Sequence, residues 1–370
     1  PHPSRTNLSA LAVAVLLLAG VVVMSGRSTL TAGAVGGAAS GGASLCFGEV
    51  AVSQELANTV TLIDQSTDTI THTIAGPSSV GGVAYSGDGH YLFAPGRAFH
   101  EIVMIDTSTN QSVRTLTLPD IPYAVVSNFS GSIVWVAVAN SSITAIDTSS
   151  DTVLATTMMS NTIALMLSPD GAKLWATHAN GTGSVDLYEL EPTTLAQLSM
   201  TPAVSNGYES ALSPDGTKIY FGGWGLTGID VFDTTTRTTT RLGNVPGPRQ
   251  ITPSADGRLL YTVADQNQVF AVDATTGQST PGVVLGTVMS GGSPIAITTN
   301  ATGTALYVTW VNYAQGGLIV LDPNGLSVRT VIRSEIYSPA AACPLAVDPA
   351  LPTTTTTTAA PGPVGPAFTG

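Results

Sequence analysis

The sequence L-S-P-D-G occurs twice in this chain, at 167–171 and again at 212–216. In each copy, two residues follow the glycine, and then an apolar residue and an aromatic one, Leu174-Trp175 and Ile219-Tyr220. Proline presets φ, aspartate accepts hydrogen bonds within its own turn, and glycine tolerates positive φ, so this motif is typical of a tight turn between two strands. The same turn 45 residues apart indicates a structural repeat.

Degenerate copies of the turn raise the count to seven. S-G-D-G at 86–89 and S-A-D-G at 254–257 are clear copies, and D-P at 348–349 is a remnant. S-N-F-S-G at 127–131 and T-N-A-T-G at 299–303 are looser, and each is aligned here with one extra residue. The seven markers lie 41 to 49 residues apart, which is the length of one four-stranded blade of a β-propeller.

A second motif recurs in step with the first. An apolar residue and an acidic residue end an alternating run, and Thr/Ser-rich residues follow, at Ile63-Asp64, Ile105-Asp106, Ile146-Asp147, Leu190-Glu191, Phe232-Asp233, Val272-Asp273 and Leu321-Asp322. Side-chain oxygens of such turns accept hydrogen bonds from nearby backbone N–H groups. One unit therefore has four predicted strands, at 209–213, 218–221, 228–233 and 238–242.

Two residue types keep their place in the repeat. The first strand carries alanine in six units, at Ala84, Ala124, Ala164, Ala211, Ala296 and Ala346. The second strand carries an aromatic residue in six units, at Phe93, Trp135, Trp175, Tyr220, Tyr261 and Tyr307. Small residues suit an innermost strand, and we interpret the regular aromatics as packing between neighbouring blades rather than as ligand contacts.

The two ends of the repeat region complement each other. The last unit stops after its first strand, predicted at 344–348, while the region begins with three strands at 49–53, 59–64 and 69–74. The sequence therefore predicts an all-β, seven-bladed β-propeller of four-stranded antiparallel blades over residues 45–352, with the seventh blade closed by strands from both ends. Such closure removes the open edges of the ring.

The recurring pattern S-P-D-G-x-x-[LI]-[YW], followed by an apolar run and D-T-x-T, resembles the YVTN-type β-propeller repeat. The resemblance covers about residues 46–350, although the name-giving Tyr-Val-x-Asn is only approximated, by L-Y-V-T at 306–309 and L-Y-T-V at 260–263. That family includes archaeal surface-layer proteins and exported bacterial propellers. The resemblance implies an exported binding or surface role, and it carries over no catalytic residue, because the repeat residues are structural.

The segments outside the repeats indicate export to the cell surface. Residues 1–24 contain a 17-residue apolar run at 8–24, which is predicted to be a signal peptide or an N-terminal membrane anchor, and 25–44 form a Gly/Ala/Ser-rich linker. Residues 353–370 form a Thr/Pro-rich tail predicted to be disordered. Its end, P-A-F-T-G, resembles a cell-wall sorting signal; a linker to a further domain is the alternative.

The two cysteines, Cys46 and Cys343, form a candidate disulfide. In the predicted register they lie at opposite ends of a strand of five residues, roughly 17 Å apart, whereas a disulfide requires Cα atoms within about 7 Å. Either the segment before Glu49 folds back, or both thiols stay unpaired. Export favours the disulfide.

Composition excludes several functions. The net charge is −12 with only 12 Lys and Arg, so no basic patch is available for nucleic acid. The chain has no H-E-x-x-H, clustered cysteines, calcium loop, G-x-S-x-G elbow or phosphate-binding glycine motif, so we expect no metal and no cofactor.

A ligand site is expected on the face opposite the S-P-D-G turns, at the turns between strands two and three and the loops that lead into strand one. These loops carry polar and aromatic residues, although surface loops are generally polar. The candidate ligand-binding residues are His100, Glu101, His178, Asn180, Tyr208, Glu209, Trp224, Arg249, Asp265, Asn267, Trp310, Asn312 and Tyr313.

Three functions fit these observations. The first is an extracellular or cell-surface scaffold that binds a protein, a peptide or a glycan, with membrane contact only through its N-terminal segment and cell-wall attachment through its tail. The second is an enzyme resembling propeller lactonases or lyases, which requires His100, Glu101, His178 and Asp265 to point into one pocket. The third is a structural component of a surface layer.

Overall fold

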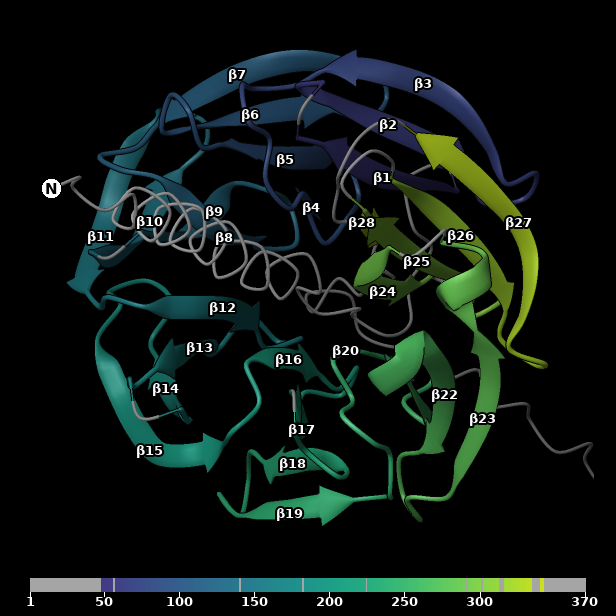
Figure 1. The fold of residues 1–370 in the computed structure, drawn as a ribbon. Helices are drawn as coiled ribbons and strands as arrows, with labels where there is room; N and C mark the ends of the chain where they lie inside the picture. Colours follow the sequence, from purple (N-terminus) through teal and green to yellow (C-terminus); the bar gives the residue numbers. More distant parts are fainter. Residues whose placement is uncertain are drawn as a thin grey trace, which may run out of the picture.

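The fold is an all-β propeller of seven four-stranded antiparallel sheets around a central axis, as the sequence predicts (Figure 1). The computed structural model describes residues 48–55, 57–139, 141–181, 183–223, 225–289, 292–300, 302–312, 316–334 and 340–342. Within this part of the chain no helix is long and apolar enough to span a membrane.

We number the blades I to VII along the chain and give the strands of each from the inside outward. Blade I consists of β4 (Ala84–Tyr85), β5 (Tyr91–Gly96), β6 (Glu101–Asp106) and β7 (Gln111–Thr117). Blade II consists of β8 (Pro122–Ser127), β9 (Ile133–Val138), β10 (Ser142–Asp147) and β11 (Thr152–Met158). Blade III consists of β12 (Thr162–Leu167), β13 (Leu174–Ala179), β14 (Val185–Leu190) and β15 (Gln197–Ser205). Blade IV consists of β16 (Glu209–Leu212), β17 (Lys218–Gly222), β18 (Ile229–Asp233) and β19 (Thr239–Leu242). Blade V consists of β20 (Gln250–Pro253), β21 (Leu259–Val263), β22 (Gln268–Asp273) and β23 (Ser279–Val284). Blade VI consists of β24 (Ser293–Thr299), β25 (Leu306–Val311), β26 (Gly316–Asp322) and β27 (Ser327–Ser334). Blade VII consists of β28 (Ala340–Ala342), β1 (Glu49–Gln54), β2 (Thr59–Asp64) and β3 (Thr69–Ala75). Two short 3-10 helices, η1 (Asp265–Asn267) and η2 (Leu285–Thr287), lie in blade V and after it.

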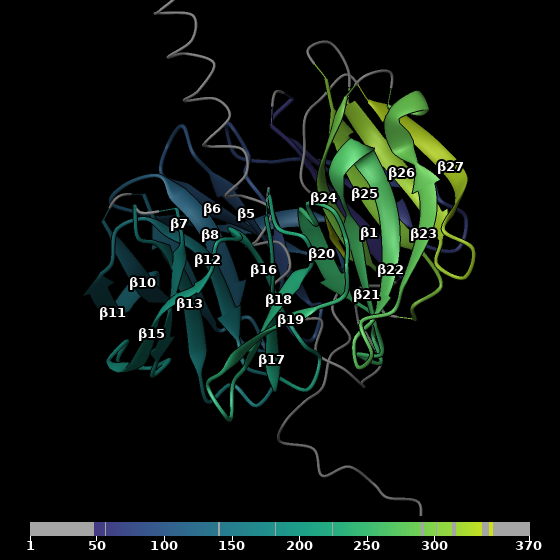
Figure 2. The ribbon, with the colours of Figure 1, turned by 60° about the horizontal axis from the view of Figure 1, so that its bottom comes forward.

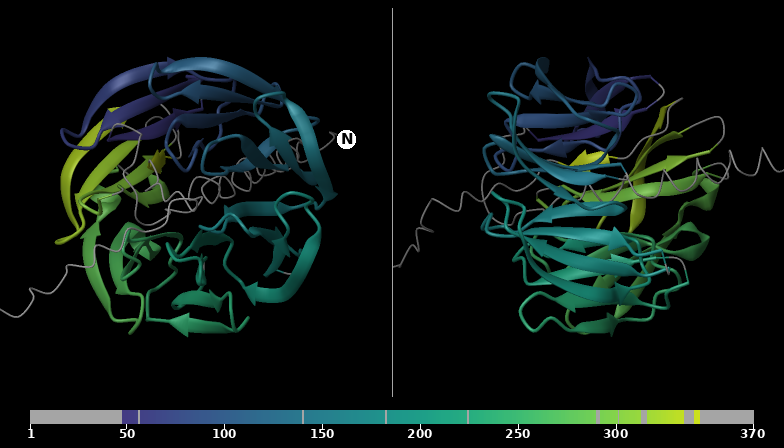
Figure 3. Two further views of the ribbon diagram at one scale, coloured as in Figure 1. Left: turned by 180° about the vertical axis from the view of Figure 1, so that it is seen from behind. Right: turned by 90° about the vertical axis from the view of Figure 1, so that its left-hand side faces the viewer.

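The first strands of the seven blades form the inner wall of the ring. Each of β4, β8, β12, β16, β20, β24 and β28 contacts the first strand of the next blade, and β28 contacts β4, so this inner ring is closed. The fourth strands lie on the perimeter (Figures 1 and 3). Alanines of the first strands, such as Ala124, Ala164 and Ala211, are buried, as an innermost strand requires.

Blade VII joins the two ends of the propeller, as predicted, but its closing strand comes earlier in the chain than the prediction placed it. β28 pairs antiparallel with β1, with Val50 opposite Ala342 and Val52 opposite Ala340. The predicted strand at 344–348, Cys46 and Cys343 lie outside the described residues, so the disulfide stays a prediction; β28 ends one residue before Cys343 rather than starting there.

The S-P-D-G turn is a repeated hydrogen-bonded unit. In blade I, Ser86 Oγ donates to Asp88 (2.6 Å) and accepts from the Tyr91 N–H (2.9 Å), while Asp88 accepts from the His90 N–H (2.9 Å). Gly89 has φ +73°, and its N–H donates to the Ser86 carbonyl (2.9 Å). The same bonds recur around Ser168, Ser213 and Ser254.

The two looser copies of this turn contain no extra residue, contrary to the sequence alignment. Asn128 and Asn300 occupy the place of the serine, because the Asn128 Oδ1 accepts from the Ile133 N–H (3.0 Å) and the Asn300 Oδ1 from the Ala305 N–H (3.0 Å), five residues on, as the serine Oγ does. An amide oxygen thus replaces the hydroxyl, and the turn keeps its length.

The acidic-Thr turns between strands three and four also repeat. The carboxylate of Asp233 accepts the N–H groups of Thr235 (2.9 Å) and Thr236 (2.7 Å), and Arg237 takes the left-handed conformation with φ +59°. The corresponding residue of every blade has positive φ: Asp68, Asn110, Asp151, Leu195, Arg237, Gly277 and Leu326. In blades I, II and IV a threonine follows the turn acid and donates to the glycine carbonyl of the S-P-D-G-type turn of the same blade: Thr107 Oγ1 to Gly89 (2.7 Å), Thr148 Oγ1 to Gly131 (2.7 Å) and Thr234 Oγ1 to Gly216 (3.0 Å). In these three blades the two turns therefore support each other.

The strand-two aromatics lie between blades, as predicted. Each shares a buried cluster with the apolar residue before the turn acid of the next blade: Phe93 with Ile146, Trp135 with Leu190, Trp175 with Phe232, Tyr220 with Val272, Tyr261 with Leu321 and Tyr307 with Ile63. The rings of Trp175 and Phe232 meet edge to face at 6.2 Å. At the seventh junction β1 has no aromatic residue, and Tyr85 of β4 packs with Leu62 and Ile105 instead.

Replacing Trp175 with alanine is expected to lower the free energy of unfolding by about 3–5 kcal/mol, since it removes a buried ring from the contact between blades III and IV. Urea unfolding followed by circular dichroism measures the loss. Met158→Ala, a change at an exposed side chain, is the control and should shift stability by no more than about 0.5 kcal/mol. Equal effects of both changes would contradict the inter-blade role.

Acid is expected to destabilise the propeller through its turns. Hydrogen bonds from the Ser66 hydroxyl and the Thr67 N–H lower the pKa of Asp64 from 3.8 to about 2, and bonds from Thr194 and Thr193 lower that of Glu191 from 4.5 to about 2. A carboxyl group whose pKa is lower in the folded than in the unfolded state stabilises the fold above its unfolded pKa, and loses that effect as the pH falls through its folded pKa.

Melting temperatures measured by circular dichroism should therefore change little from pH 7 to pH 5 and fall between about pH 4.5 and pH 2. A double variant, Asp64→Asn with Glu191→Gln, should lose less than the wild type over the same interval. An equal or larger loss in the variant would argue that these turns do not carry the effect.

Candidate functional site

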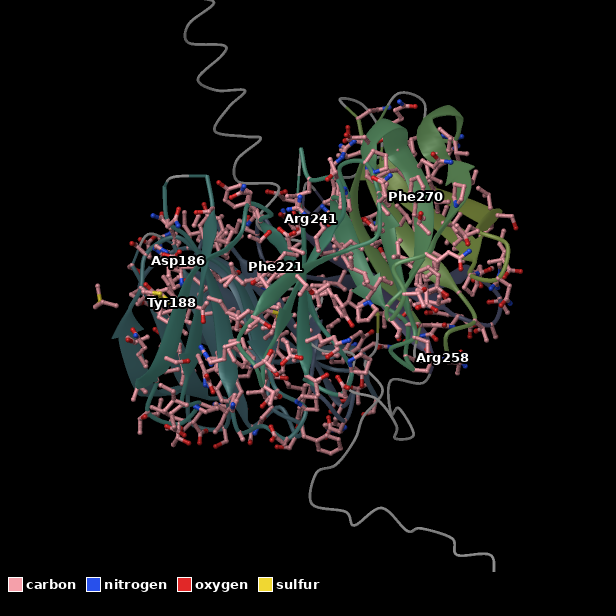
Figure 4. All side chains as sticks on the ribbon, turned by 90° about the horizontal axis from the view of Figure 1, so that it is seen from below. Asp186, Tyr188, Phe221, Arg241, Arg258 and Phe270 are labelled. Atoms are coloured by element: carbon pink, nitrogen blue, oxygen red, sulfur yellow. The ribbon has the colours of Figure 1, made fainter. Side chains whose placement is uncertain are left out.

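The propeller has two chemically different faces. The S-P-D-G and acidic-Thr turns lie on one, which we call the turn face; the turns between strands two and three and the loops leading into strand one lie on the other, the loop face. Figure 2 shows the ring tilted, and in Figure 4, seen edge-on, Arg258 lies toward the turn face and Asp186 toward the loop face. The candidate residues belong to the loop face.

Polar groups on the turn face are engaged in holding blades together. Glu189 is almost completely buried and binds Lys173 (2.8 Å) and Arg237 (2.7 Å), while Arg237 also donates to Ser199 (2.7 Å). Burial alone would raise the pKa of Glu189, but the hydrogen bonds from Lys173, Ser199 and Arg237 bring it below its usual value. Arg237 also lies 6.0 Å from the ring of Trp175, so this cluster is a junction between blades III and IV.

On the loop face, blade III brings together two of the predicted residues. The Asn180 amide donates to Asp186 Oδ1 (2.9 Å) and to Ser184 Oγ (2.8 Å), which fixes the turn after β13. His178 Nδ1 lies 3.9 Å from Asp186 Oδ2, and the His178 ring meets that of Tyr188 edge to face at 5.8 Å. His178, Asn180 and Asp186 are therefore one polar group, of which the sequence identified two members.

Blade V also brings two predicted residues together. Arg249 Nη2 lies 3.7 Å from Asp265 Oδ1, so the loop leading into β20 contacts the turn after β21. Burial lowers the pKa of Arg249, and the charge of Asp265 opposes that effect. Gly247 has φ +54°, which favours glycine, and a Cβ there would come within 2.5 Å of the Asp265 carboxylate, so a larger residue would displace that side chain. Asn267, in η1, donates to the Gly292 carbonyl (3.4 Å).

Blade IV combines an exposed aromatic ring with buried carboxylates. Tyr208 is exposed directly before β16, whereas Glu209, the first residue of β16, is buried. Close by in the blade, Asp230 accepts from Arg241 Nε (2.8 Å) and from Ser205 Oγ (2.8 Å). The backbone near Gly207 approaches Gly222 so closely that a Cβ at Gly207 would lie 2.4 Å from the Gly222 carbonyl oxygen.

Blades VII and I meet in a further polar contact that the sequence did not predict. Arg97 Nη1 lies 3.3 Å from Glu55 Oε1, which also accepts from Ser79 Oγ (3.2 Å). Phe99, two residues after Arg97, is 71% exposed, the second most exposed large apolar side chain in the described part of the chain.

The remaining predicted residues have different surroundings. His100 has φ +54°, and its carbonyl accepts from the Leu118 N–H (2.8 Å); Glu101 begins β6 and is partly buried. Trp310 is completely buried in β25, within the cluster between blades V and VI, so its ring is not at the surface. Asn312 follows β25 and is partly buried, while Trp224 and Tyr313 lie outside the described residues.

The four residues named for the enzyme hypothesis come from three different blades. His100 and Glu101 belong to blade I, His178 to blade III and Asp265 to blade V. Among the described residues, no group of three or more His, Cys, Asp or Glu side chains is placed to hold a metal ion. His178 and Asp265 instead contact charged partners of their own blades.

Sequence reasoning missed Arg97, Phe99 and Asp186, and a signal for each was present. Arg97 and Phe99 occupy the same turn as His100, and Asp186 follows the turn that contains Asn180. None of the three belongs to the repeat, so the periodic pattern could not single them out.

Comparison with known proteins supports the fold. No family model matches the chain, and no curated protein matches it. Solved structures do: a functionally unknown protein from Desulfotomaculum acetoxidans DSM 771 is similar over 80% of this chain and 98% of that chain, with TM-score 0.65 and 13% identity. Kuenenia stuttgartiensis hydrazine synthase is similar over 78% and 93%, with TM-score 0.58 and 16% identity. The dihydro-heme d1 dehydrogenase NirN, solved in complex with DHE, is similar over 82% and 76%, with TM-score 0.57 and 11% identity. At these identities the likeness shows the propeller fold, which hosts both scaffolds and enzymes.

Proposed function

We propose that this protein is an exported propeller that binds a polar macromolecule, a protein, a peptide or a glycan, on its loop face. The observation that carries the proposal is the contrast between the two faces. On the turn face the acidic side chains repeat from blade to blade and accept hydrogen bonds from their own turns, as Asp64 and Asp106 do. On the loop face the polar and aromatic side chains differ in every blade.

Repetition and variation have different physical meanings in a propeller. A side chain that recurs at one place in every blade serves a contact that every blade makes, such as a turn or a junction. The loop face instead carries a different group in each of several blades. Phe99 and Tyr208 are exposed aromatic residues of blades I and IV, the His178–Asp186 pair belongs to blade III, and Arg249 belongs to blade V. Exposed aromatic rings with a few fixed charged groups are typical of recognition surfaces.

The proposal also covers where the protein is located and to which propeller family it belongs. The repeat motif supports membership of the YVTN-type propellers, and the apolar run at 8–24, the linker at 25–44 and the Thr/Pro-rich tail at 353–370 support export and attachment at the cell surface. All three segments lie outside the described residues. A structural role in a surface layer is compatible with the same motif, and ordered self-assembly of the purified protein would indicate it.

Binding is tested by hydrogen–deuterium exchange with two probes, chitotetraose for glycans and a phage-selected peptide for proteins. We expect a bound probe to protect the loop-face segments 97–101, 206–210 and 247–250, and to leave the turn-face segments 86–90 and 106–110 unchanged. Phe99→Ala and Tyr208→Ala should each weaken binding at least about tenfold, as loss of a buried aromatic anchor does.

His90→Ala, on the turn face, is the matched control and should leave affinity unchanged. Protection confined to the turn face, or equal losses in His90→Ala and Phe99→Ala, would overturn the assignment of the binding face. Binding of neither probe by the full chain would count against a peptide or glycan ligand.

A further inference from the structure

The ring is closed by a seam at which the two ends of the propeller meet. β28, from the C-terminal side, pairs with β1, from the N-terminal side (Figure 1). Beside this ladder, Arg329 of blade VI donates to Asp68 of blade VII (2.8 Å), and Tyr307 of blade VI packs in one cluster with Ile63 of blade VII. Each of the other six blades consists of four consecutive strands, so the ring depends on this seam to stay closed.

The two cysteines of the chain flank this seam. Cys46 comes two residues before Gly48, where the described chain begins, and Cys343 directly follows Ala342, the last residue of β28. Neither cysteine belongs to one of the repeated motifs. Both lie outside the described residues, so their relation to each other has to be argued from the register of β1 and β28.

This register removes the distance that argued against a disulfide. With the closing strand where the sequence predicted it, Cys343 and Cys46 would lie at opposite ends of β1, roughly 17 Å apart. β28 instead runs antiparallel to β1 and ends with Ala342 opposite Val50, close to the turn face. The next position of the ladder is the one opposite Glu49, where antiparallel partners have Cα atoms about 5 Å apart. Both cysteines therefore adjoin the same end of the same strand pair.

The N-terminal side of the seam is within reach of the same place. Three residue steps separate Cys46 from Glu49, and three steps of chain span at most about 10 Å. Gly48 has φ +77°, a left-handed conformation that ends the line of β1, and its carbonyl accepts from the Gln65 N–H (2.8 Å). A disulfide needs Cα atoms within about 7 Å, which a segment that turns at Gly48 can provide while β1 and β28 keep their places.

We propose that Cys46 and Cys343 form a disulfide that closes the ring covalently at the turn face and makes the closure of blade VII depend on redox conditions. The thiolate of one cysteine attacks a sulfur of a donor disulfide, and the thiolate of the other then displaces the donor. The chain loses two electrons and two protons in this exchange, and the donor leaves as thiols. Such a donor belongs to an oxidising compartment, and in this respect the inference rests on the proposed export.

The bond changes what holds the two ends of the propeller together. In the reduced protein, the described ladder between β28 and β1 contains three residue pairs, and its loss would expose β1 as a free edge. The disulfide would enclose blades I to VI and three strands of blade VII in one covalent loop. Closing so long a loop restricts the unfolded chain, which favours the folded ring.

Peptide mapping of the purified full chain tests the bond, whatever the protein binds and wherever it is located. The chain is oxidised with glutathione disulfide, its free thiols are blocked with N-ethylmaleimide, and it is digested with trypsin without reductant. We expect one linked pair, the peptide that ends at Arg97 and the peptide that begins at Ser334, which reductant separates. Alkylation of both cysteines in the folded, oxidised protein overturns the proposal, as does a disulfide between two copies of the chain.

Hydrogen–deuterium exchange tests what the bond does. Reduction should speed exchange of β1 at least about tenfold and leave β9 of blade II unchanged, because opening begins at the seam. Cys46→Ser and Cys343→Ser should each reproduce this change without reductant, and the double variant should add nothing to it. Ser44→Ala is the matched control and should exchange as the wild type does. Equal exchange of β1 in the oxidised and reduced protein would overturn the redox-dependent closure, even if the bond forms.

Discussion

A four-stranded blade cannot bury either of its own faces, and the whole structure depends on how neighbouring blades meet. The recurring contact is an aromatic ring from the second strand of one blade against the apolar residue that precedes the turn acid of the next, as with Trp175 and Phe232. Six of the seven junctions contain this contact, and at the junction of blades VII and I Tyr85 of β4 packs with Leu62 and Ile105 instead. Stability in this arrangement is shared around the ring, because each junction completes the burial of two sheets.

The turns follow from the same constraint. The threonine that bonds the S-P-D-G turn, such as Thr107 to the Gly89 carbonyl, fixes the third strand relative to the first hairpin, and this strand carries the apolar residue on which the neighbouring aromatic packs. Because these turns recur from blade to blade, much of the polar chemistry of that face repeats around the ring. Most of the variation lies on the loop face and the outer wall, which carry none of these repeated turns.

Periodicity explains which features could be predicted from the sequence. The turn motifs and the strand-two aromatics recur in most blades, so each copy supports the interpretation of the others. Their count gives the number of blades, and the incomplete units at the two ends predict the shared seventh blade. Asn128 takes the place of the turn serine because its side chain accepts a hydrogen bond from the backbone N–H of Ile133. A sequence alignment that compares residue types does not show this equivalence. The position of β28 was missed because any short run of small residues suits the inner wall. In the candidate site, the pairing of Arg249 with Asp265 and the burial of Trp310 depend on loop geometry that occurs once.

The pairing of β28 with β1 gives the ring a mechanical weak point. The two strands are antiparallel, and Glu49 and Ala342 lie at the same end of their ladder, on the turn face. A load applied between these two residues therefore peels the hydrogen bonds apart one after another instead of shearing them all at once. Within the described residues three pairs join the two strands, so in the reduced protein a pull at the ends of the propeller opens blade VII first and exposes β1 as a free edge, while the other six blades keep their own four strands.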